Sequence, residues 1–166
     1  MSNGKVIVHL DPWEYERAGF VALRRGTSNW GRPDSAAYKD KEKQEPNRRA
    51  EFASCLCELA VAKHLNQYWS GSVWSWKDID PETQKTFPDV GHNIEVRRVR
   101  SASGPAVKKK DKDKFVYGAK VIGDEWMSVE ILGWVVANDY IKDLKGRKYL
   151  SVPVMHLNSP TKKTDC

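Results

Sequence analysis

The sequence predicts an α/β or α+β domain in which a central mixed β-sheet is flanked by helices. Three observations lead to this fold class. The length of 166 residues suits a single domain spanning residues 1–166. Residues 46–66 form a helical segment that is apolar or small on nearly every side, as in helices packed against a sheet. Several short segments of β-type residues follow it, an order that does not fit a helical bundle or a β-sandwich.

The N-terminal third predicts two helices and a connection. A short apolar run over residues 6–10 precedes Asp11 and Pro12, a capping residue and a first-turn proline that indicate a helix start, and this helix is expected to end near Arg25. Residues 26–45 lack periodicity and predict a mobile connection. In the second helix Glu58 is the sole charge between residues 52 and 62, so its carboxylate should have a cationic partner.

The remaining elements are mostly strands. Segments rich in β-branched and aromatic residues predict strands over residues 73–76, 93–99, 115–122, 129–136 and 149–152. A short helix over residues 138–144, ended by Gly146, separates the last two strands. Residues 159–166 are expected to form a flexible tail.

Composition narrows the class of protein. With 28 Lys and Arg against 22 Asp and Glu the net charge is +6, which suits an anionic partner. Three cysteines are too few for a disulfide framework, and the four histidines lack the paired spacing of zinc ligands. No apolar stretch approaches the ~20 residues that cross a bilayer, so we expect a cytoplasmic protein without a membrane partner.

Two carboxylates are expected to converge within residues 87–100. Side-chain alternation along a strand places Glu95 and Arg97 on one face and Ile94 and Val96 on the other. The turn at residues 91–93 lets Asp89 fold back beside Glu95. With Glu58 on the helix alongside, three acids would surround one point, and oxygen ligands of this kind suit Mg²⁺.

In this arrangement the chain resembles the PD-(D/E)XK nucleases, and most of all their small phage-encoded members. That family has an acid on its first core helix, then Pro-Asp, then Asp or Glu, any residue and Lys on a neighbouring strand. The matching residues here are Glu58, Pro88-Asp89 and Glu95-Val96-Arg97, with Gly133-Trp134-Val135 and a short helix downstream. The resemblance covers the order of core elements over residues 46–136.

The resemblance implies a restriction-endonuclease-like core and a Mg²⁺-dependent deoxyribonuclease that hydrolyses phosphodiester bonds through metal-activated water, with Mn²⁺ as a substitute metal. It implies that Asp89, Glu95 and the backbone carbonyl of Val96 hold the metal and that Glu58 is a direct or water-mediated ligand. A phage-encoded member would work in the cytoplasm of its host cell.

Arg97 departs from the family pattern, which has lysine at this position. A guanidinium cannot lose its proton in a protein and so cannot act as a base. It can still neutralise charge on the scissile phosphate or orient the attacking water, which leaves activation of that water to the metal. Lys63 and Lys85 are the candidates for the missing amine.

A basic segment follows the metal-binding strand. Residues 97–120 contain nine Lys or Arg against two Asp, a net charge of +7, whereas the rest of the chain sums to −1. We expect this segment to contact the phosphate backbone of DNA, although a solvated hairpin tip over residues 104–114 is the alternative. The predicted DNA-binding residues are Arg98, Arg100, Lys108, Lys109, Lys110, Lys112 and Lys114.

Three functions therefore compete. The first is the Mg²⁺-dependent nuclease, with a homodimer as one expected assembly because many nucleases that cut both strands pair up. The second is a nucleic-acid-binding protein of the same fold with little or no hydrolytic power. The third is a protein-binding module that uses the aromatic cluster of Tyr68, Trp69, Trp74 and Trp76.

Overall fold

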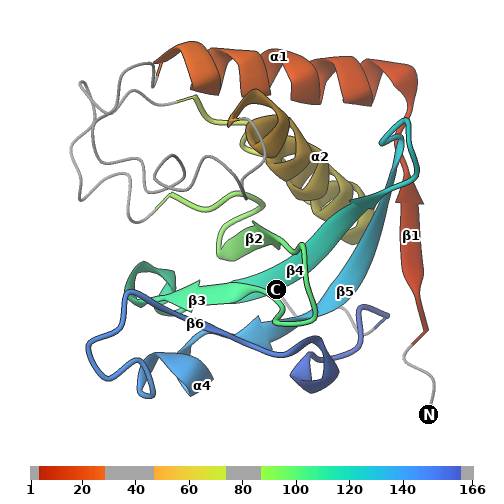
Figure 1. The fold of residues 1–166 in the computed structure, drawn as a ribbon. Coiled ribbons are helices and arrows are strands. Elements are labelled where there is room, and N and C mark those ends of the chain that lie inside the picture. Colours follow the sequence, from red (N-terminus) through yellow and green to blue (C-terminus); the bar gives the residue numbers. More distant parts are fainter. Residues whose placement is uncertain (1–3, 29–46, 74–86, 162–166) are drawn as a thin grey trace.

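A computed structural model describes residues 4–28, 47–73 and 87–161, and these form an α+β fold around a mixed sheet (Figure 1). In chain order the elements are β1 (Val6–His9), α1 (Pro12–Ser28), α2 (Asn47–Leu65), β2 (Ile94–Arg98), β3 (Ala106–Lys108), a 3-10 helix (Lys109–Asp111), β4 (Phe115–Ile122), β5 (Ser128–Val136), α4 (Asn138–Ile141), β6 (Tyr149–Ser151) and a second 3-10 helix (Val154–His156). The expected strand at residues 73–76 falls almost wholly outside the described residues, as do most of the expected connection and tail.

The main sheet has four strands in the order β1-β5-β4-β2. Strand β2 runs parallel to β4, and the other two pairs are antiparallel, so the sheet is mixed as the sequence predicts. Along β5 buried and half-buried residues alternate, which is the pattern of a strand with two different faces. Because β2 lies at the end of this order, the residues before it sit at an edge of the sheet.

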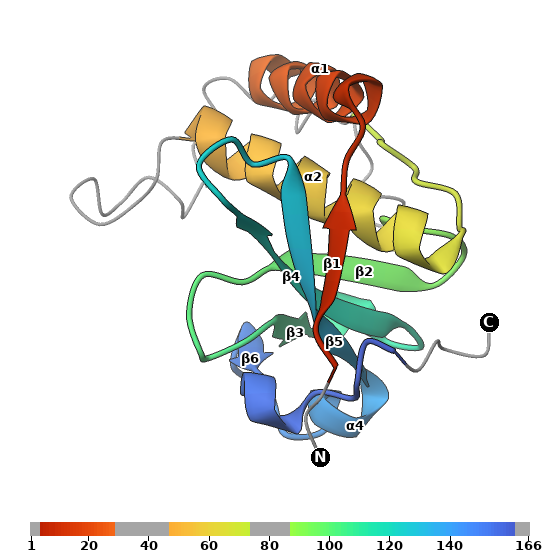
Figure 2. The same cartoon turned by 90° about the vertical axis from the view of Figure 1, so that its right-hand side faces the viewer.

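Both long helices lie on one face of the sheet, with α2 directly against the strands and α1 on top of α2 (Figure 2). The core between α2 and the sheet includes Leu56 from α2, Ile94 from β2, Tyr117 from β4 and Ile131 from β5. The middle of α2 is buried on nearly all sides, which explains why its sequence is so poor in charge. No helix among the described residues is long and apolar enough to cross a membrane.

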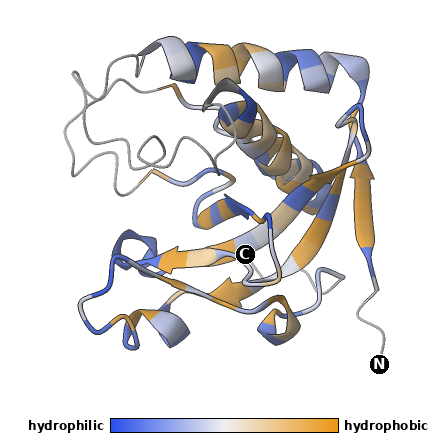
Figure 3. Cartoon of the chain, viewed as in Figure 1, coloured by the Kyte–Doolittle hydropathy of each residue, from blue (hydrophilic) through white to orange (hydrophobic). Residues whose placement is uncertain are grey.

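A smaller core covers the opposite face at one end of the sheet. Strands β3 and β6 pair with each other and, with α4, enclose Val107, Val116, Val135 and Val152. Hydropathy follows this arrangement, since apolar colour runs along β3 and β5 while polar colour marks the turns between elements (Figure 3). Residues 104–114 are therefore not a solvated hairpin tip, because this stretch contains β3 and the fully buried Asp111.

The local backbone explains why position 133, in the Gly-Trp-Val sequence, is a glycine. It adopts a φ of +141°, a conformation that side chains disfavour, beside a register irregularity between β4 and β5. A Cβ atom at this position would collide with the backbone carbonyl of Asn158. The glycine thus permits the close approach of the C-terminal segment to β5.

Candidate functional site

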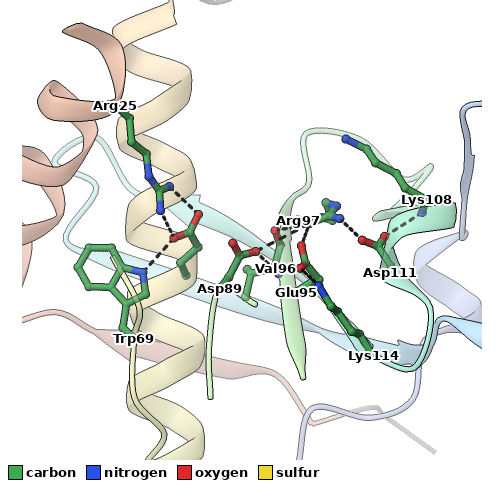
Figure 4. A network of polar contacts seen from close by, with 10 residues as sticks. Arg25, Trp69, Asp89, Glu95, Val96, Arg97, Lys108, Asp111 and Lys114 are labelled. Carbon is green, nitrogen blue, oxygen red and sulfur yellow. Dashed lines mark hydrogen bonds and ion pairs between the residues drawn. The ribbon is translucent and has the colours of Figure 1, made fainter. Parts of the chain in front are cut away.

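Two of the three predicted acids, Asp89 and Glu95, lie at the edge of the sheet where the chain enters β2 (Figure 4). A turn before this strand is closed by the backbone N–H groups of Asp89 and Val90, which donate to the carbonyl of Ile94. Gly91 in this turn has a positive φ of 56°. Asp89 folds back along β2 as predicted, and its Oδ2 accepts the backbone N–H of Val96 at 2.8 Å.

Glu58 has the cationic partner that the sequence demands, and it is Arg25 from α1. The guanidinium donates from Nη1 to Oε1 at 2.8 Å and from Nη2 to Oε2 at 3.0 Å, and both side chains are buried. Trp69 Nε1 donates to Oε2 at 2.9 Å, and Arg25 Nε donates to the carbonyl of Ser72. Burial opposes the charge of Arg25, but the carboxylate of Glu58 outweighs it and raises the pKa of Arg25.

Glu95 is held by two cations. Lys114 Nζ lies 2.6 Å from Oε1, and Arg97 Nη1 lies 2.9 Å from Oε2. Burial alone would raise the pKa of Glu95, but the charge of Arg97 and the hydrogen bond from Lys114 lower it. Lys114 is only 8% exposed, so its ammonium lies inside the site and not on an exposed surface like the other lysines of the predicted DNA-binding segment.

Arg97 is fixed from its other side by a residue that sequence reasoning missed. Its Nη2 donates to Oδ1 of Asp111 at 2.7 Å, and Asp111 Oδ2 accepts the backbone N–H of Lys108. Nothing in the local sequence marks Asp111, which stands in a run of lysines. It is nevertheless fully buried in the 3-10 helix that follows β3, which only the fold reveals.

Asp89 is the one acid of this group without a close cationic partner. Its nearest cation in the described part of the chain is Arg97, whose Nη1 lies 3.8 Å away, and its side chain is 23% exposed. Burial and the negative charges of Glu58 and Glu95 raise the pKa of Asp89 from 3.8 to about 8. Figure 4 shows Asp89 between the side chains of Arg25 and Trp69 on one side and the group around Glu95 on the other.

The three acids do not form the cage that was expected. Ile94 and Val96 face α2 in the main core, so alternation directs Glu95 to the opposite face of β2, away from the helix that holds Glu58. Asp89, at the sheet edge, lies between them. Among the described residues no group of three or more His, Cys, Asp or Glu is placed to hold a metal ion.

The other predicted residues take varied positions. Lys63 does not supply the missing amine, because its Nζ lies 2.7 Å from Glu14 and 3.2 Å from Asp11 at the start of α1. Lys85 lies outside the described residues. Arg98 is half-buried, and the exposed predicted residues are Arg100, Lys108, Lys109, Lys110 and Lys112.

Comparison with protein-family models, with curated proteins and with solved structures finds no match. A function for this chain must therefore be inferred from the contacts described above.

Proposed function

We propose that this protein is a Mg²⁺-dependent nuclease that hydrolyses DNA and that its sheet and α2 form a restriction-endonuclease-like core. The observation that carries the proposal is the state of Asp89. This carboxylate is partly exposed at the edge of the sheet, and burial together with the charges of Glu58 and Glu95 raises its pKa to about 8, which Arg97 at 3.8 Å only partly opposes. A divalent ion bound here would stabilise the ionised form of Asp89, and carboxylate oxygens are ligands that Mg²⁺ prefers.

The chemistry of the donors fits Mg²⁺. Asp89, Glu95 and the carbonyl of Val96 would supply hard oxygen ligands. Among the described residues, the connected side chains count four acids (Glu58, Asp89, Glu95 and Asp111) against three bases (Arg25, Arg97 and Lys114), an excess of one negative charge when Asp89 is ionised. Bound Mg²⁺ would activate water and neutralise charge on the scissile phosphate.

The chain's own cations serve the phosphate in this proposal. Lys114 brings an amine to Glu95 from the residue before β4, and so replaces the lysine that the family has at the position of Arg97. Arg97, oriented by Asp111, adds a fixed positive charge beside it. Both cations now bond Glu95, and an entering phosphate would draw them away from that carboxylate.

Glu58 has a different part in this arrangement. Both of its oxygens are bonded to Arg25, which is itself anchored to Ser72, and one also accepts from Trp69. We therefore assign Glu58 to holding α1 and α2 beside the site, where its charge still acts on Asp89.

A nucleic-acid-binding protein without hydrolytic activity is the second candidate. It is favoured by the occupation of both Glu95 oxygens, since a carboxylate already paired with Arg97 and Lys114 holds a metal less readily.

Cleavage assays separate these two functions. We expect the purified protein to cut linear, circular or single-stranded DNA with Mg²⁺ or Mn²⁺ but not with EDTA. Lys114→Met should reduce the rate at least ~100-fold, because a buried cation facing developing negative charge is removed. Lys5→Met, at an exposed lysine just before β1 and outside the predicted DNA-binding residues, is the matched control and should retain the rate. Thermal unfolding checks that both variants fold.

Two outcomes would contradict this expectation. A wild-type protein that binds DNA but cuts none of the three substrates with either metal would favour the second candidate. Equal rates for Lys114→Met and Lys5→Met would show that the buried amine takes no part in hydrolysis.

A further inference from the structure

A second basic segment lies outside the one that the sequence analysis singled out. Residues 142–148, between α4 and β6, contain Lys142, Lys145, Arg147 and Lys148 against a single acid, Asp143. All five of these side chains are exposed. Arg147 bonds the carbonyls of Asp143 and Leu144 and so stabilises the turn, which leaves the three lysines directed to solvent.

The fold places this segment beside the first one. Strands β3 and β6 are antiparallel, with Lys108 paired to Tyr149, so residues 142–148 arrive next to residues 108–112. Figure 1 shows the 3-10 helix after β3 and the turn before β6 at the same end of the two-stranded sheet. We call residues 108–112 together with residues 142–148 the basic surface.

The charge of the chain is concentrated on the basic surface. Each of its two segments has four basic residues and one aspartate, so the net charge of the surface is +6, which equals that of the whole chain and leaves the remaining residues neutral in sum. None of its lysines forms an ion pair with another described residue. Unpaired lysines on neighbouring segments create a positive potential that attracts a polyanion.

The basic surface is physically joined to the candidate site. Asp111 accepts the backbone N–H of Lys108 with one oxygen and the guanidinium of Arg97 with the other. Arg97 in turn contacts Glu95. A nucleic acid, whose phosphates repeat along its backbone, could contact both places at once.

We propose that the basic surface binds the phosphate backbone of duplex DNA on one side of the candidate site, and that residues 142–148 supply about half of these contacts. The proposal rests on the proposed function for the location of the scissile phosphate. Binding by this surface needs neither metal nor hydrolysis, so the two ideas can fail separately.

The test measures affinity for a 20-base-pair duplex in EDTA over a series of salt concentrations. Lys142→Gln with Lys148→Gln should lower the slope of log affinity against log salt by about 2 and weaken binding at least ~10-fold near 0.1 M salt, because two phosphate contacts are lost. The matched control, Lys5→Gln with Arg24→Gln, removes the same charge from exposed residues near β1 and on α1 and should leave the slope unchanged.

Equal slopes for the two double variants would overturn the proposal, as would tighter binding to RNA or to anionic lipid vesicles than to duplex DNA. The same duplex incubated with Mg²⁺ reports on the proposed function separately. Salt-dependent binding through residues 142–148 without cleavage would support the basic surface and reject the nuclease, whereas cleavage with unchanged slopes would do the reverse.

Discussion

Arg25→Met is expected to lower the free energy of unfolding by about 3–5 kcal/mol, because it leaves the carboxylate of Glu58 buried without its partner. The side chains of Arg25 and Glu58 are each only 7% exposed, so water cannot replace the guanidinium. The same change breaks the contact of α1 with the carbonyl of Ser72. Denaturant unfolding followed by circular dichroism measures the loss.

The adjacent Arg24→Met is a matched control, since Arg24 is exposed and its guanidinium lies over the ring of Phe20. It should cost less than about 1 kcal/mol. Adding Glu58→Gln to Arg25→Met should recover part of the stability, because the buried charge is removed while an acceptor for Trp69 remains. If Arg25→Met costs no more than Arg24→Met, the ion pair does not stabilise the fold.

Asp89→Asn should abolish Mg²⁺-dependent cleavage and at the same time stabilise the metal-free protein. Asparagine keeps an acceptor for the backbone N–H of Val96 but removes the charge that Glu58 and Glu95 oppose. Above pH 8 we expect a gain of about 2–5 kcal/mol in the free energy of unfolding. A change that removes function while adding stability is the behaviour of a group held for binding rather than for folding.

The pH dependence of this gain has a definite sign. The pKa of Asp89 is about 8 in the folded protein against 3.8 ordinarily, so between these values the folded chain keeps a proton that the unfolded chain has released. The contribution of Asp89 to the stability of the wild type therefore falls as pH rises from about 4 to 8 and stays level above it. The difference between Asp89→Asn and wild type should be near zero below pH 4 and greatest above pH 8.

The effect of Mg²⁺ on stability provides a second comparison between the wild type and Asp89→Asn. Mg²⁺ at 100 times its dissociation constant should raise the stability of the wild type by about 2.7 kcal/mol and leave Asp89→Asn unchanged. Asp124→Asn, which alters an exposed aspartate between β4 and β5, should behave as wild type in every assay. A wild type whose stability does not depend on Mg²⁺ would argue against metal binding at Asp89.

Local sequence patterns were sufficient to predict much of the candidate site. The Asp-Pro start of α1 and the return of Asp89 to β2 follow from chain geometry within a few residues, and both are confirmed. The need of Glu58 for a cation followed from the cost of burying a charge. That the cation is Arg25 could not be predicted, because the two residues lie 33 positions apart in the sequence and on different helices.

The lysines show most clearly what could not be predicted from the sequence. Lys63, Lys112 and Lys114 look alike in the sequence, yet they lie respectively at the start of α1, in solvent and against Glu95. The prediction from sequence also placed the excess positive charge incorrectly. It assigned all of this charge to residues 97–120 and counted residues 142–148 with the rest of the chain, which has no excess positive charge. Pairing of β3 with β6 joins them to residues 108–112.

The sequence by itself determined the two long helices, the strands β2, β4, β5 and β6, the direction of side chains along β2 and the turn that returns Asp89, since each depends on residues close together in the chain. It did not predict β3, which forms by pairing with the distant β6. Only the tertiary structure decided which charges meet. Glu58 and Glu95 point to opposite faces of the sheet edge, and Arg25, Asp111 and Lys114 arrive there from distant elements. Charge pairing depends on distance in space, and the packing of helices and strands sets that distance.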